Sequence, residues 1–113
     1  MYTDFNAGNK DYKLKLSVGS IVALEKRLGK NPVAIFGFDE NNPVIPTVTD
    51  MIAILWASAQ DAHHGISYTD AQNIFQEWLD DGHIPTDFIK VITEIYKASG
   101  IFKNDKKDNT EKN

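Results

Sequence analysis

Four segments of this sequence place apolar residues three or four positions apart, the spacing that puts them on one face of an α-helix. Thr47 and Asp50 resemble a capping box, and the apolar residues that follow them recur at helical spacing up to Gly65. Each of the other three segments also ends at a glycine, which suits the left-handed residue just past a helix. The predicted helices lie between these pairs: Ser17 and Gly29, Thr47 and Gly65, Ser67 or Thr69 and Gly82, and Pro85 and Gly100.

The start of the chain has a different period. In residues 12–16, Tyr12, Leu14 and Leu16 alternate with lysines, the pattern of a half-buried strand. Residues 2–5 can pair with this strand, because the turn formers of residues 6–9 lie between them. Two strands alone are marginally stable, so we expect the hairpin to pack against the helices. The predicted fold class is mainly α (α+β): four main helices with a small N-terminal β-hairpin.

The length and the apolar content favour one domain. The chain has 113 residues, of which 42% are hydrophobic, enough for one core. Residues 1–102 carry the apolar pattern and are predicted to form a single helical domain. Residues 103–113 are polar or charged without a large apolar side chain, so we expect them to form a disordered tail. Residues 38–46, which include Asp, Glu, two Asn and two Pro, are the main predicted internal loop.

Composition narrows the functional classes. The sequence has no cysteine, which excludes disulfides and thiolate chemistry, and no run approaching 18 apolar residues, so we expect no membrane span. The first residues lack the pattern of a signal peptide, and a cytoplasmic location is the expectation. Ten carboxylates but one cation, Lys90, lie between Asp39 and Glu94, whereas six basic residues lie between Lys10 and Lys30. Basic residues are therefore concentrated near the start of the predicted domain, and acidic residues in the rest of it.

Few residues invite a catalytic or metal-binding interpretation. His63 and His64 follow Asp61, but adjacent helical residues point about 100° apart, so the two rings do not readily hold one ion. A role at the end of the second helix is the better interpretation. Asp80 and Asp81 are adjacent acids with nothing else converging on them, which favours a solvated helix end. We therefore expect no catalytic residue, no metal, no cofactor, no small-molecule substrate and no enzymatic activity.

Nucleic-acid binding is the main alternative from another class. The third and fourth helices have the short connection of a helix-turn-helix. From Asp70 to Glu94, however, six carboxylates outnumber the cations, whereas phosphate contacts require lysine and arginine. The expectation is no nucleic-acid partner. A small DNA-associated or regulatory protein of a mobile element is kept as the alternative.

The order of these elements resembles a known family. The passage from the strand into the first helix ends in Leu24-Glu-Lys-Arg-Leu-Gly29, and two further segments read Asp50-Met-Ile-Ala-Ile-Leu-Trp-Ala-Ser-Ala59 and Ile66-Ser-Tyr-Thr-Asp-Ala-Gln72. From about residue 10 to residue 102 the sequence resembles the tail assembly chaperones of long-tailed bacteriophages, notably those of phages and prophages of Gram-positive bacteria. That resemblance implies a non-enzymatic protein of the bacterial cytoplasm, absent from the mature virion. Its partners would be the tape-measure protein, which it keeps soluble before the tail tube assembles, and the tail-tube protein.

A chaperone needs apolar side chains that a client can cover. Trp56 and Trp78 are most simply interpreted as core residues of the second and third helices. The candidates for contact with a partner lie on the surplus apolar side of the second helix, in the segment after the first helix, and at the end of the domain: Phe36, Phe38, Ile54, Ile101 and Phe102. The acidic half is expected to steer a basic client. A self-assembling tail component, and with it a homo-oligomer, is the remaining alternative.

Overall fold

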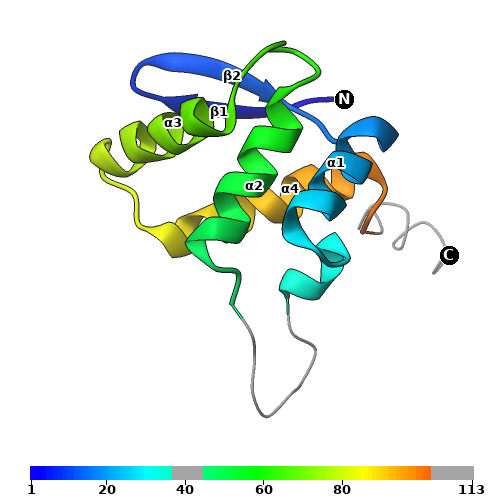
Figure 1. Cartoon of the computed structure of the whole chain (residues 1–113). Helices are drawn as coiled ribbons and strands as arrows, with labels where there is room; N and C mark the ends of the chain where they lie inside the picture. The colour runs from blue at the N-terminus through cyan, green and yellow to red at the C-terminus, as the bar shows by residue number, and fades with distance from the viewer. Residues whose placement is uncertain (37–44, 103–113) are drawn as a thin grey trace, which may run out of the picture.

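Helix α2 (Val48–Ala59) lies at the centre of the fold (Figure 1), which is a computed structural model that describes residues 1–36 and 45–102. Helices α1 (Val18–Leu28) and α3 (Tyr68–Asp80) flank α2, and α4 (Phe88–Ser99) contacts α2 from behind in this view. Two short 3₁₀ helices, η1 (Pro32–Ile35) and η2 (Pro85–Asp87), precede α2 and α4. The predicted fold class is confirmed. The predicted tail and most of the predicted loop lie outside the described residues.

The N-terminal hairpin pairs β1 (Thr3–Ala7) with β2 (Lys10–Leu14) in antiparallel register. Gly8 and Asn9 form the two-residue turn with φ angles of 57° and 65°, the positive values that a type I′ turn requires. The turn is therefore tighter than the predicted one. The inward residues of β1 are buried, and the strand contacts both α3 and α4. The hairpin thus obtains from these helices the support that two strands lack alone.

The helix starts follow the capping residues of the sequence. The Ser17 hydroxyl accepts from the backbone N–H of Ser20 at the start of α1. Thr47 and Asp50 form a reciprocal capping box on α2, as predicted, and Ser67 begins α3 in the same manner. At the other end of α1, Gly29 has the left-handed conformation, with φ 70°.

Helix α2 is shorter than predicted. It ends at Ala59, and residues 60–65 form turns instead of continuing to Gly65. The Gln60 side chain donates from Nε2 to the carbonyl oxygens of Trp56 (3.0 Å) and Ile66 (2.8 Å). These bonds satisfy a carbonyl at the helix end and hold the chain that returns toward α3. The helix therefore stops without a glycine.

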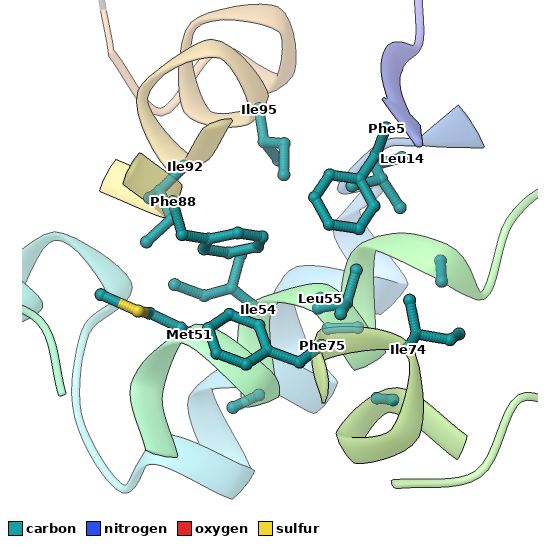
Figure 2. Close-up of a cluster of buried hydrophobic side chains, with 14 of the residues drawn as sticks. Phe5, Leu14, Met51, Ile54, Leu55, Ile74, Phe75, Phe88, Ile92 and Ile95 are labelled. Atoms are coloured by element: carbon teal, nitrogen blue, oxygen red, sulfur yellow. The ribbon is translucent and has the colours of Figure 1, made fainter. Parts of the chain in front are cut away.

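The core lies where α2, α3, α4 and the hairpin meet. In Figure 2 the labelled side chains of these elements point toward one another, with the ring of Phe88 among them. The centroids of Phe5, Phe75 and Trp78 lie 5.6, 5.4 and 5.5 Å from that of Phe88. Such tilted and edge-to-face pairs add to the free energy gained from burial.

Ile54 is part of this core. Its side chain is fully buried, so the prediction that Ile54 contacts a partner is wrong for the folded chain. The reason is that helices pack around α2, so that its second apolar side also faces protein. Helix α2 is therefore the central helix of the core.

Val18 is the opposite case. The helical spacing of Val18, Ile21, Leu24 and Leu28 predicts that these residues share one buried stripe, but Val18 is 80% exposed. At 100° per residue Val18 lies about 120° around the helix from Leu24, the residue that α1 buries completely. Val18 and Val22 therefore leave an apolar strip on the outer side of α1, where both are exposed.

Tyr96 makes folding stability sensitive to alkaline pH. The Tyr96 hydroxyl donates to the carbonyl of Pro32 (3.0 Å), and burial raises the pKa of this phenol well above its ordinary value of 10.0, with the charge of Asp50 as a smaller cause. Above pH 10 the unfolded chain loses the Tyr96 proton and the folded chain keeps it, so the free energy of unfolding falls as pH rises, by at most about 1.4 kcal/mol per pH unit.

Urea unfolding on either side of pH 10 measures that slope. Tyr96→Phe should show a shallower slope than the wild type, although Tyr12, whose pKa is also raised by burial, adds to the slope of both proteins. Equal slopes would contradict this account of Tyr96.

Candidate functional site

An exposed cation packs against two aromatic rings where α1, α2 and α3 meet. The guanidinium of Arg27 lies 4.7 Å from the ring centre of Trp56 and 4.1 Å from that of Tyr68. The two rings are themselves 6.3 Å apart, in an edge-on arrangement. Cation–π contacts of this kind hold the guanidinium against the rings. They fix the side chain of Arg27 at the protein surface.

Trp56 is thus not the core residue that the sequence suggested. Trp78 is buried as predicted, whereas Trp56 is half-buried and packs only partly against the core. The position of Trp56 on an apolar stripe does not indicate that its ring lies at the surface, because the contact with Arg27 comes from another helix. Tryptophan, tyrosine and arginine are the residues most enriched at the energetic centres of protein interfaces.

A shallow groove runs from this cluster along α1 and α2. It consists of two hollows of about 450 and 320 Å³ that share Ala23 and Trp56. The first hollow is completed by Lys26 and Arg27. The second extends toward the start of α1 and the end of α2 and is completed by Ser17, Gly19, Ser20, Ala57, Gln60, Asp61 and His64. We call the whole the α1–α2 groove.

The α1–α2 groove has a charge at each end. Lys26 and Arg27, both exposed, provide positive charge in the last turn of α1. At the opposite end lies Asp61, whose carboxylate accepts from the Ser17 hydroxyl (3.3 Å), beside the exposed His64. Between the two ends, the lining is small or aromatic. A ligand that lies along the groove therefore meets a cationic end, an apolar middle and an end bearing a carboxylate.

The predicted partner residues form a separate cluster. The rings of Phe36 and Phe102 lie 5.8 Å apart, and both contact Tyr96, with centroid distances of 6.0 and 5.3 Å. Ile101 joins them through its backbone N–H, which donates to the carbonyl of Tyr96 (3.0 Å). Phe36, Ile101 and Phe102 are half-buried, and none of them lines the α1–α2 groove. Phe38, the remaining candidate, lies outside the described residues.

The two central histidines have different surroundings from those predicted. Because α2 ends at Ala59, neither lies in its last turn. His63 accepts with Nε2 from the backbone N–H of Lys13 (3.0 Å), and its ring packs edge-on against Tyr12, 5.3 Å away. His63 therefore holds the outer edge of β2, and His64 faces solvent at the groove.

Removing the His63 acceptor should loosen the hairpin. His63→Ala is expected to lower the free energy of unfolding by about 1 kcal/mol, because the Lys13 N–H loses its partner but can bond to water. Amide hydrogen exchange should rise at Lys13 more than in α4. Unchanged exchange at Lys13 would show that this bond does not hold the strand.

Another hollow, of about 450 Å³ and separate from the α1–α2 groove, lies beside α4. Its wall is the ring of His83 stacked on that of Trp78, with the ring centres 4.4 Å apart and the planes 6° from parallel. Nδ1 of His83 lies 3.8 Å from Oδ2 of Asp87, an atom that also accepts from the N–H of Ile84 (3.0 Å). Asp87 thus serves mainly to cap η2. Nothing in the sequence pattern around His83 indicates that its ring reaches Trp78.

The adjacent acids have separate partners. Asp81 accepts from the backbone N–H of Gly8 (2.9 Å) in the hairpin turn, and Asp80 accepts from the side chain of Gln76 (2.9 Å). They do not act as a pair. In residues 1–36 and 45–102, no three His, Asp or Glu residues are placed to hold a metal ion. Across the same residues, no helix combines the length and the apolar character needed to cross a membrane.

The fold and the groove define a small α+β domain that presents an aromatic and cationic surface between two helices. Residues 3–113 match the model of a family of unknown function, DUF6096, and the chain belongs to that family. Neither the curated proteins nor the solved structures contain a match to it.

Proposed function

We propose that this domain is a phage tail assembly chaperone that binds an apolar helical segment of the tape-measure protein in the α1–α2 groove. The observation that carries the proposal is the groove itself, with Arg27 packed against Trp56 and Tyr68 at its cationic end. The client is suggested by the resemblance of residues 10–102 to the tail chaperones. The physical role is to cover an apolar stripe before the tail tube encloses it.

The surface of the domain suits reversible binding. Val18 and Val22 are exposed on the outer side of α1. On the helix surface they lie next to the groove residues Gly19 and Ala23. Apolar side chains beside a groove extend the area that a partner covers. The aromatic and arginine cluster provides an anchor that a client helix can meet without reorganising the core.

Co-expression tests this function. A tape-measure protein is expected to be encoded near this chain, and that protein should be soluble and co-purify with the chain when the two are expressed together. Expressed alone, it should aggregate. As a matched control, Ile84→Ala removes an apolar side chain that is 60% exposed but does not line the groove, and it should retain binding. A tape-measure protein that is equally soluble with and without this chain would refute the proposal.

A further inference from the structure

We infer that the α1–α2 groove selects an amphipathic helix that carries acidic side chains at one end, which rests on the proposed function and adds the chemistry of the bound segment. From Ser17 to Arg27 the groove follows ten residues of α1, or about 15 Å at 1.5 Å per residue. Three turns of a helix span this length. Gly19 and Ala23 let the backbone of such a helix approach closely.

The cationic end determines the sign of the charge that fits. Within residues 1–36 and 45–102, Lys30 reaches Asp50 (3.8 Å), but Lys26 and Arg27 form no ion pair. Both aromatic rings pack against the exposed Arg27 side chain from adjacent sides, so the guanidinium N–H donors that point away from the rings are available to a carboxylate, which can accept two bonds. Glutamate or aspartate side chains on the bound helix meet both cations.

This local charge opposes that of the whole chain. The net charge of −4 favours a basic client at long range, which is the expectation drawn from the sequence. At the groove, a lysine placed against Lys26 and Arg27 would be repelled, and the acid that could attract it, Asp61, lies at the other end. Charges in direct contact with the ligand act at short range and determine the orientation of the bound helix in the groove.

Two helix-stabilised peptides of about 14 residues test the inference by fluorescence anisotropy. They share one apolar stripe and differ in whether two glutamates or two lysines stand at one end, with neutral residues elsewhere. The glutamate peptide is expected to bind the wild-type chain about fivefold more tightly at low salt, and this preference should shrink as salt is raised.

Lys26→Glu provides the decisive comparison, because Lys26 lines the groove but does not stack on the rings. It should abolish or reverse the preference for the glutamate peptide. Lys90→Glu makes the same change of net charge beside Trp78 and should leave the preference intact. Equal binding of both peptides, or a preference that Lys26→Glu does not alter, would overturn the inference.

The outcomes separate this inference from the proposed function. If the tape-measure protein binds the wild-type chain but the preference is absent, the charge selection is wrong and the chaperone role stands. If the chain instead dimerises in light scattering and Trp56→Ala makes it monomeric, a second copy fills the groove, which would also overturn the inference.

Discussion

Trp56→Ala is expected to weaken binding of the tape-measure protein by about thirtyfold or more, the effect of truncating an aromatic residue at the energetic centre of an interface. Trp56 lines both hollows of the α1–α2 groove and supports Arg27, so its loss removes the apolar middle together with one of the two rings that hold the cation. Isothermal titration with a soluble helical fragment of the client measures the change.

The fold should survive this substitution. Trp56 is half-buried, and its neighbours Leu55 and Ala57 anchor α2 in the core. Circular dichroism of Trp56→Ala is therefore expected to match that of the wild type. Trp56→Phe, which keeps a ring beneath Arg27, should lose less affinity than the alanine variant. If the folded Trp56→Ala variant bound the client with wild-type affinity, the groove would be excluded as the docking surface.

Phe88→Ala is expected to lower the free energy of unfolding by about 3–5 kcal/mol, a large share of the roughly 5–15 kcal/mol that stabilise a typical domain. The Phe88 ring is fully buried and contacts the rings of Phe5, Phe75 and Trp78 from β1 and α3. Removing it leaves a cavity where the hairpin and two helices meet.

Urea denaturation of Phe88→Ala measures this loss. Ile84→Ala, in the same part of the chain but 60% exposed, should change stability by less than about 0.5 kcal/mol. A cost below about 1 kcal/mol for Phe88→Ala would mean that the aromatic cluster does not hold the hairpin to the helices.

The helices could be predicted because their signals are local. Thr47 and Asp50, or Ser17 and Gly29, act through backbone groups within a few residues, so the sequence pattern already contains the interaction. The end of α2 could not be found in this way, since the Gln60 side chain bonds to Ile66 only after the chain has turned.

The candidate site was less predictable, because tertiary packing decides which apolar residues face solvent. Ile54 and Trp56 are two positions apart on α2, and the sequence favoured contact with a partner for Ile54 and the core for Trp56. The helices around α2 bury Ile54 and leave Trp56 at the edge, where Arg27 covers it. That cluster joins three helices, and no spacing within one helix could indicate it.

The indole N–H signals of the two tryptophans provide the most direct test of the α1–α2 groove as the client-binding surface. The sequence has two tryptophans, one in the groove and one beside His83, so each reports on a different face. In a ¹⁵N–¹H spectrum recorded while a helical fragment of the tape-measure protein is added, the Trp56 indole signal should shift and that of Trp78 should stay in place. A shift confined to Trp78, or saturated binding that moves neither signal, would contradict the account.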